Sequence, residues 1–200
     1  MLDSKIRVYW DRGMRPVGGF IAKTRISPNA ITLLGVVIQI VVAVEILRGA
    51  LLVAGLVAIV AALFDVFDGA VAKAKGITSS FGAFLDSTTD RIADALYFGP
   101  LAWLYGVRPD TPGRDEPWVA AVALATLVLV FMVSYAKARA EALGYDAKVG
   151  LAERAERAIV MIAGLILNLV PAALVIVGVA SAITFLQRLF HVRAQAVRGG

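Results

Sequence analysis

The chain of 200 residues has no cysteine, and only 18% of its residues are charged. The absence of cysteine excludes disulfide bonds and metal sites with thiolate ligands. The small share of charged residues argues against an ordinary soluble domain, in which about a quarter of the residues are charged. The sequence contains no internal repeat and no sign of a second domain, so we expect a single domain over residues 1–200.

Hydrophobic residues make up 60% of the chain, and the mean hydropathy is +0.80. A helix needs about twenty apolar residues to cross a hydrocarbon core of ~30 Å, and residues 31–50 form one such run. The pattern predicts an all-α integral membrane protein with a six-helix bundle over residues 27–193. Its six transmembrane helices are expected at residues 29–49, 51–74, 84–106, 117–143, 155–170 and 172–192.

The first 25 residues hold six basic and two acidic side chains among scattered apolar ones. A signal peptide would instead show a short apolar core and a cleavage site with small residues. We therefore expect residues 1–26 to form an amphipathic helix on an anionic lipid surface. Basic residues also gather in the 73–75 turn, the 137–157 connection and the C-terminal tail, which predicts cytoplasmic termini in a multi-pass cell-membrane protein. Nothing in this pattern suggests a nucleic-acid partner.

Four aspartates stand at the ends of two apolar segments: Asp65, Asp68, Asp86 and Asp90. The first two are three residues apart and the last two are four apart, so each pair shares one face of its helix. Antiparallel helices joined by a short turn would bring the four carboxylates together, where they repel one another and lose hydration. Carboxylate oxygens in such a group suit a divalent cation, Mg²⁺ or Mn²⁺.

The same four acids would also suit two different roles. The aspartates could pair with Arg91 or a neighbouring lysine and close the helix ends. They could also line the path of a cation transporter, although that function needs acids near the bilayer midplane. A transporter does not require the small residues Gly69, Ala72 and Gly82, which would let a phosphate approach the backbone.

The whole stretch reads Asp65-x2-Asp68-Gly69-x2-Ala72-Lys73-x8-Gly82-x3-Asp86-x3-Asp90. It closely resembles the signature of the CDP-alcohol phosphotransferases, which are membrane enzymes of phospholipid synthesis. The resemblance implies six transmembrane helices, an N-terminal amphipathic segment and a homodimer. The family usually has arginine at the position of Lys73, and lysine keeps the positive charge without the bidentate geometry.

The same resemblance implies roles for the site residues. Asp65, Asp68 and Asp86 would hold two metal ions on the diphosphate of a CDP-lipid, and Asp90 would bind metal and act as general base. The CDP-lipid would be bound by Asn29, Thr32, Gly69, Ala72, Lys73 and Gly82. This assignment suits the chemistry, because two cations can neutralise the diphosphate and the departing CMP while a carboxylate takes the proton of the attacking hydroxyl.

A second polar cluster suits the binding of an anion. Its members are Ser134, Lys137, Arg154, Arg157 and Arg188. The first two are three residues apart, as are the next two, so each pair can face one anion-binding pocket. The alternative is that these residues form ion pairs four residues apart within a helix, such as Lys137 with Glu141.

The elements SYxKARAE, ERxER and QRL around these residues resemble those of the actinobacterial phosphatidylinositol phosphate synthases and the archaetidylinositol phosphate synthases. This resemblance implies transfer of the phosphatidyl group of CDP-diacylglycerol to inositol 1-phosphate, with release of CMP. It also implies that the phosphate of this acceptor substrate occupies the basic pocket. Glycerol 3-phosphate is the alternative acceptor, because its phosphate would suit the same arginines.

Overall fold

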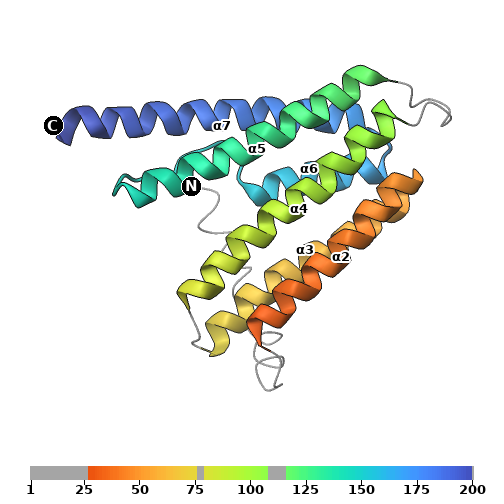
Figure 1. Cartoon of the computed structure of the whole chain (residues 1–200), viewed down its shortest axis with the longest axis horizontal. Helices are drawn as coiled ribbons and strands as arrows, with labels where there is room; N and C mark the ends of the chain where they lie inside the picture. Colours follow the sequence, from red (N-terminus) through yellow and green to blue (C-terminus); the bar gives the residue numbers. More distant parts are fainter. Residues whose placement is uncertain (1–26, 76–78, 108–115, 200) are drawn as a thin grey trace. The chain divides into compact units, whose positions relative to one another are not determined.

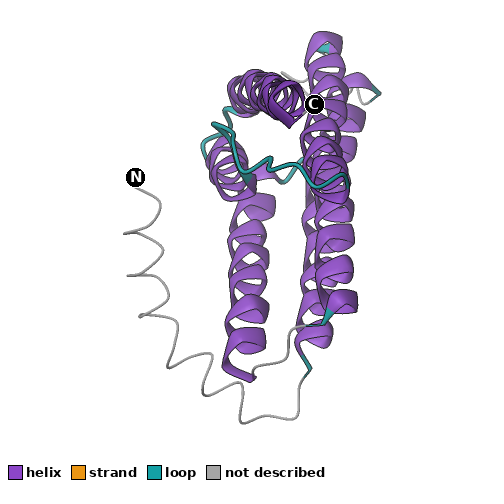
Figure 2. Cartoon of the chain, turned by 90° about the vertical axis from the view of Figure 1, so that its left-hand side faces the viewer, coloured by secondary structure: helices purple, strands orange, loops and turns teal. Residues whose placement is uncertain are grey.

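The structure is a computed structural model that describes residues 27–75, 79–107 and 116–199, with the side chains of residues 28, 66–75 and 199 excepted. The amphipathic helix expected at residues 1–26 lies outside the described residues and stays a prediction. Within the described part, every regular element is a helix and none is a strand (Figure 2). The prediction of an all-helical protein is therefore confirmed.

Six helices follow one another along the described chain (Figure 1). They are α2 (Pro28–Arg48), α3 (Leu51–Lys75), α4 (Ser80–Gly106), α5 (Pro117–Ala142), α6 (Arg154–Ile166) and α7 (Val170–Gly199). Three of them contain a stretch long and apolar enough to cross a membrane: Asn29–Arg48, Pro117–Ala142 and Val170–Arg198. The protein thus has the helices of a multi-pass membrane protein, and the expected count of six spans stays a prediction.

Three helix boundaries differ from the predicted ones by four residues or more. Helix α7 continues to Gly199, beyond the predicted residue 192, and the other two differ for local reasons. Helix α4 begins at Ser80, before the predicted residue 84, because the Ser79 hydroxyl accepts a hydrogen bond from the Gly82 N–H at 2.9 Å. This contact caps the first turn of the helix. Helix α6 ends early at Ile166, where Asn168 adopts a positive φ of 56° and reverses the chain into α7.

The chain forms two compact units, and helices α2, α3 and α4 each contribute residues to both. One unit contains the described residues up to Val41 together with Val57–Ala93. Inside it, α2 and α3 approach closely at Gly35, where an added Cβ would lie 4.0 Å from the Phe64 Cβ. This unit carries all four aspartates of the sequence motif.

The other unit contains Val42–Leu56 and Asp94–Gly200. In it, α5 and α7 lie side by side along much of their length (Figure 1), and α6 packs against α7. Small residues allow this close approach: a Cβ added at Gly178 of α7 would lie 2.8 Å from the Thr126 hydroxyl oxygen of α5. Its fully buried core includes Ile46, Leu101 and Leu174.

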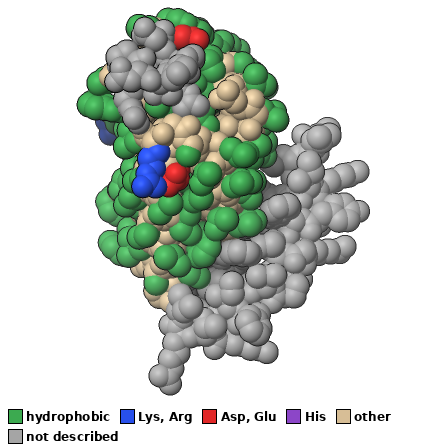
Figure 3. All heavy atoms as spheres, turned by 90° about the vertical axis from the view of Figure 1, so that its right-hand side faces the viewer, with side chains coloured by type: hydrophobic (Ala, Val, Ile, Leu, Met, Phe, Trp, Pro, Cys, Tyr) green, Lys and Arg blue, Asp and Glu red, His purple; other side chains and the backbone are tan. Residues whose placement is uncertain are grey.

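Large hydrophobic side chains also cover much of the described surface (Figure 3). Val37, Leu124 and Ile176 are examples that are each about half exposed. A soluble protein rarely exposes so much contiguous apolar surface. The same side chains are favourable against lipid tails, so the surface agrees with a protein embedded in a bilayer.

Candidate active site

Three of the four predicted aspartates meet between helices α3 and α4. Oxygen atoms of Asp65, Asp86 and Asp90 all lie within 4.8 Å of one another. Asp65 comes from α3, whereas Asp86 and Asp90 lie one turn apart on α4. The side chain of Asp68 lies outside the described part of α3, so its place in this group stays a prediction.

The donor set of this group fits a hard divalent cation. Three carboxylates at such short range repel one another strongly unless positive charge is brought among them. Asp65 and Asp86 are exposed and Asp90 is half-buried, so an ion can enter from solvent and still be partly enclosed. These features favour Mg²⁺ or Mn²⁺, which both prefer oxygen ligands.

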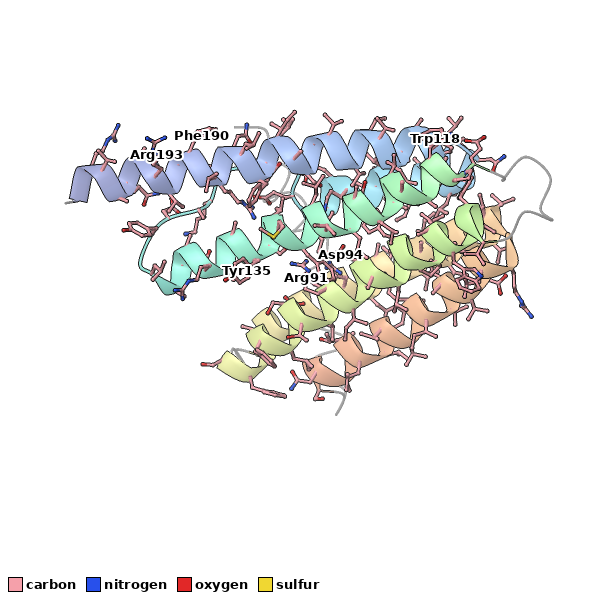
Figure 4. All side chains as sticks on the ribbon, turned by 45° about the horizontal axis from the view of Figure 1, so that its top comes forward. Arg91, Asp94, Trp118, Tyr135, Phe190 and Arg193 are labelled. Atoms are coloured by element: carbon pink, nitrogen blue, oxygen red, sulfur yellow. The ribbon has the colours of Figure 1, made fainter. Side chains whose placement is uncertain are left out.

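Arg91, one residue after Asp90, supplies positive charge beside the group. One guanidinium nitrogen of Arg91 lies 3.9 Å from a carboxylate oxygen of Asp90. That distance is too long for a hydrogen bond but short enough for electrostatic attraction. Arg91 and Asp94 succeed each other along α4 (Figure 4), so charged side chains continue for a full turn beyond Asp90.

The hydroxyl groups between Asp86 and Asp90 are bound within their own helix. Ser87, Thr88 and Thr89 each donate a hydrogen bond to a main-chain carbonyl three or four residues earlier, at 2.8–3.0 Å. Such bonds satisfy the hydroxyls locally. The carboxylates are therefore the groups on this part of α4 that are suited to hold a metal.

The predicted CDP-lipid residues begin at the start of α2. A Cβ added at Gly82 would lie 3.7 Å from the Asn29 side-chain oxygen, so these two predicted residues are neighbours. Thr32 is half-buried on the next turn of α2. Gly69, Ala72 and Lys73 lie on α3, in the stretch whose side chains are not described.

The predicted acceptor residues surround the connection between α5 and α6. Helix α5 ends with Gly144 in the left-handed region, at φ 82°, and the Tyr145 N–H bonds the Ala140 carbonyl at 2.9 Å. This is the usual way in which glycine ends a helix. The chain then runs as an irregular loop over residues 143–153, which we name the acceptor loop, and leads directly into α6.

Two buried arginines hold main-chain carbonyls at this loop. Arg188 of α7, only 5% exposed, donates from Nε to the Val149 carbonyl at 2.9 Å and from Nη1 to the Val133 carbonyl at 2.6 Å. Arg157 of α6, 6% exposed, donates from Nη1 to the Ala152 carbonyl at 3.1 Å. These bonds fix the plane of each guanidinium, whose donors are arranged as a rigid fork.

The other three predicted acceptor residues lie nearby in sequence and differ in their contacts. The Ser134 hydroxyl donates to the Val130 carbonyl of its own helix at 3.1 Å. Lys137, on the next turn of α5, and Arg154, the first residue of α6, are half-buried. The five residues therefore come from α5, α6 and α7, which meet in one unit.

Comparison with known protein families covers both the aspartate group and the acceptor loop. The model of the CDP-alcohol phosphatidyltransferases matches residues 25–186, which include the aspartates and the acceptor loop. The chain belongs to this family. Membership identifies a membrane-bound transferase and removes the cation-transporter alternative.

Individual members of the family are similar over nearly the full chain. The archaetidylinositol phosphate synthase of Pyrococcus horikoshii is 34% identical over 98% of this chain and 99% of its own. The phosphatidylinositol phosphate synthase of Streptomyces avermitilis is 37% identical over 98% of this chain and 84% of its own.

Solved structures agree with this relationship. The crystal structure of Mycobacterium tuberculosis phosphatidylinositol phosphate synthase with CDP-DAG bound matches with a TM-score of 0.81 and 31% identity, over 90% of this chain and 94% of that one. The same enzyme in complex with manganese and citrate matches with a TM-score of 0.78 and 32% identity, over 90% and 88%. The manganese in that enzyme and the three-carboxylate group in this one both support divalent-metal binding in the family member described here.

Sequence reasoning missed two side chains that hold the acceptor loop. Thr184 and Gln195 of α7 both form hydrogen bonds with its main chain. The sequence offered one indication of their role: the spacing of Thr184, Arg188 and Gln195 places all three on one face of a helix. The spacing alone does not indicate that this face contacts the acceptor loop, which only the structure shows.

Proposed function

We propose that the protein transfers the phosphatidyl group of CDP-diacylglycerol to inositol 1-phosphate, forming phosphatidylinositol phosphate and releasing CMP. The observation that carries the proposal is the group of Asp65, Asp86 and Asp90, whose oxygens lie within 4.8 Å of one another. The names of the similar synthases, and the CDP-DAG in a related crystal structure, support the choice of substrates.

Asp65, Asp68, Asp86 and Asp90 are proposed to hold two ions of Mg²⁺ or Mn²⁺. Bound there, the ions would neutralise the diphosphate and stabilise the departing CMP. Asn29, Thr32, Gly69, Ala72, Lys73 and Gly82 would bind the CDP-lipid. Asn29 and Gly82 adjoin each other, and the missing side chain at Gly82 leaves space beside the Asn29 amide.

Asp90 is proposed to take the proton from the attacking hydroxyl of the acceptor. It is half-buried and lies beside the Arg91 guanidinium, whereas Asp65 and Asp86 are exposed. A carboxylate held close to the reacting hydroxyl can accept its proton as a general base.

Ser134, Lys137, Arg154, Arg157 and Arg188 are proposed to bind the phosphate of inositol 1-phosphate. Arginine suits this role because its fork of donors matches two phosphate oxygens at once. The guanidiniums of Arg157 and Arg188 are fixed by carbonyl contacts, so they would meet the phosphate with little loss of side-chain freedom.

We propose a homodimer in the cell membrane with both termini and the reacting groups on the cytoplasmic side. That side would receive the water-soluble acceptor and release CMP, while the lipid tails stay in the bilayer. The chain is proposed to act as one domain over residues 1–200, including the interfacial helix at residues 1–26.

The test is a panel of acceptors offered to the purified protein with CDP-diacylglycerol and Mg²⁺ in detergent, with CMP release as the measurement. Inositol 1-phosphate should be the best substrate, and free inositol should be poor because it lacks the phosphate. The Asp65→Asn protein is the control for background hydrolysis. Faster CMP release with glycerol 3-phosphate than with inositol 1-phosphate would overturn the choice of acceptor.

A further inference from the structure

Three residues on one face of α7 form hydrogen bonds with the main chain of the acceptor loop. Thr184, Arg188 and Gln195 lie on this face, and each binds backbone atoms of the loop. Phe190 and Arg193 lie on the side of α7 turned away from α5, where both are exposed (Figure 4). The polar residues on the loop side therefore form a separate row with a separate set of contacts.

The Thr184 hydroxyl is the deepest of these contacts. Its side chain is fully buried, and its oxygen accepts hydrogen bonds from the N–H groups of Leu151 and Ala152 at 3.2 and 3.1 Å. The same hydroxyl donates to the Ala180 carbonyl at 2.8 Å. One oxygen therefore satisfies two adjacent loop amides that would otherwise need another partner.

Gly150 lets the loop come this close to Thr184. It has a φ of +153°, and an added Cβ would lie 2.5 Å from the Thr184 methyl carbon. A side chain at position 150 would therefore push the loop away from α7.

Gln195 fixes the other end of the loop. Its side-chain oxygen accepts the Asp146 N–H at 2.9 Å, and its amide nitrogen donates to the Asp146 carbonyl at 2.6 Å. These paired bonds mimic the contacts of a neighbouring strand and define the path of the chain as it leaves α5. With Arg188 on the Val149 carbonyl, the loop is bound at residues 146, 149 and 151–152.

The loop ends where α6 begins, and α6 carries Arg154 and Arg157 in its first turns. Arg157 also bonds the carbonyl of Ala152, the residue whose amide is held by Thr184. A shift of residues 150–152 would therefore move the Arg157 guanidinium and the start of α6 together.

We propose that Thr184 and Gln195 are positioning residues for the acceptor site: by holding the main chain of residues 146–152 against α7, they place Arg154 and Arg157 for the acceptor phosphate. The inference rests on the proposed function of these arginines. Neither residue needs to touch the substrate. Their effect should appear in the binding of the acceptor and leave the CDP-lipid site unaltered.

The first experiment compares Thr184→Val with Thr184→Ser. Valine keeps the shape of threonine but removes the acceptor for two amides, whereas serine keeps it. Thr184→Val should raise the KM for inositol 1-phosphate about fivefold, the equivalent of one hydrogen bond, with the KM for CDP-diacylglycerol nearly constant. Thr184→Ser should restore the acceptor KM.

Thr126→Val is the matched control. Thr126 is also a buried threonine, and its hydroxyl bonds the Leu174 carbonyl far from the loop, at 3.4 Å. This variant should leave both KM values close to those of the wild type. An equal rise of the two KM values in Thr184→Val, or the same acceptor defect in Thr126→Val, would overturn the proposal.

Hydrogen exchange followed by mass spectrometry gives a readout independent of activity. Peptides that contain the Leu151 and Ala152 amides should exchange faster in Thr184→Val than in the wild type, and Thr184→Ser should restore protection. Unchanged exchange would contradict the role of the hydroxyl. If the protein prefers another phosphorylated acceptor, the proposed function fails, yet this measurement and the KM for that acceptor still test the loop.

Gln195→Met and Gly150→Ala test the inference by separate routes. Methionine removes both bonds to Asp146 with little change in size, and alanine at position 150 forces the loop away from Thr184. Both should raise the acceptor KM and the exchange at residues 146–152. Gln187→Met, at an exposed position of the same helix, is the control and should change neither. Wild-type acceptor KM values in both test variants would refute the proposal.

Discussion

Asp65 on α3 and Asp86 on α4 bring carboxylate oxygens within 4.8 Å of each other, and Asp90 joins them from the next turn of α4. Neither helix holds such a group alone, so the antiparallel pairing of α3 and α4 creates it. Like charges at this separation repel one another unless a cation is bound among them. The site therefore couples metal binding to the packing of two helices.

Replacing Asp65 or Asp86 with asparagine should remove a metal ligand while keeping the size of the side chain. We expect CMP release to fall at least about 100-fold at saturating substrates, and more Mg²⁺ to be needed for half-maximal rate. Titration of activity and of Mn²⁺ binding in the two variants measures this. Ser87→Ala, which removes a hydroxyl bound to its own helix, should behave as the wild type.

Full activity of Asp65→Asn, or CMP release by the wild type in excess chelator, would contradict the metal site. Renewed addition of Mg²⁺ is the control for the chelator experiment, because it should restore the activity of a protein that has stayed folded.

The sequence predicted the helices well because long apolar runs are typical of membrane helices. The grouping of Asp65, Asp86 and Asp90 was predictable as well, since a spacing of four places Asp86 and Asp90 on one helix face and a short turn brings the neighbouring helix beside them. The start of α4 could also have been predicted, because serine, here Ser79, is a favourable residue for capping the first turn of a helix. Hydrophobicity alone places the start of this helix at residue 84, because the apolar pattern contains no information about the capping residue.

The acceptor loop could not be predicted in the same way. Its path depends on contacts between distant residues, such as Arg188 with the carbonyls of Val133 and Val149. The sequence shows that Arg188 is a basic residue on a helix. It does not show that two of the guanidinium N–H groups are bound to main-chain carbonyls. The loop sequence has no hydrophobic periodicity, so nothing in it indicates that the Thr184 hydroxyl accepts hydrogen bonds from the Leu151 and Ala152 amides.

Asp90→Asn should separate the general base from the metal ligands. Asparagine cannot accept the acceptor proton, so kcat should fall by about 10²- to 10⁴-fold. Binding of CDP-diacylglycerol should change much less, because the other carboxylates still hold metal. Single-turnover rates and equilibrium binding of the CDP-lipid measure the two effects.

Asp65→Asn is the comparison for this experiment, because it should weaken CDP-lipid binding as well as turnover. An equally severe loss of CDP-lipid binding in Asp90→Asn would make Asp90 chiefly a ligand.

Arg154→Ala and Arg188→Ala should both weaken the acceptor but differ in their effect on stability. Each loses charge-assisted bonds to the phosphate, worth roughly 1.5–3 kcal/mol, so the KM for inositol 1-phosphate should rise about tenfold or more. Arg188→Ala should also lower the melting temperature in detergent, because the carbonyls of Val133 and Val149 each lose a hydrogen bond from the guanidinium. The KM for CDP-diacylglycerol should stay nearly constant in both.

A lower melting temperature in Arg188→Ala with an unaltered acceptor KM would make Arg188 a purely structural residue. Lower yield of inserted protein with normal KM values in Arg154→Ala would point to a role in membrane orientation.

Gly55→Ala and Gly99→Ala form a matched pair that tests helix packing in the unit that holds the acceptor loop. A Cβ at Gly55 of α3 would lie 2.5 Å from Ile166 Cγ1 and 3.2 Å from the Ile166 main-chain nitrogen, whereas a Cβ at Gly99 of α4 would meet nothing within 4 Å. Backbone atoms cannot rotate away, so Gly55→Ala should destabilise the protein by about 1–3 kcal/mol.

Gly99→Ala should be neutral or stabilising, because alanine favours a helix by about 1 kcal/mol over glycine. Thermal unfolding of the two variants in the same detergent measures the difference, and the wild type provides the reference. Because α6 packs against α3 at this glycine and carries Arg154 and Arg157, Gly55→Ala should also raise the acceptor KM. Equal melting temperatures for both variants would contradict the close approach of α3 and α6.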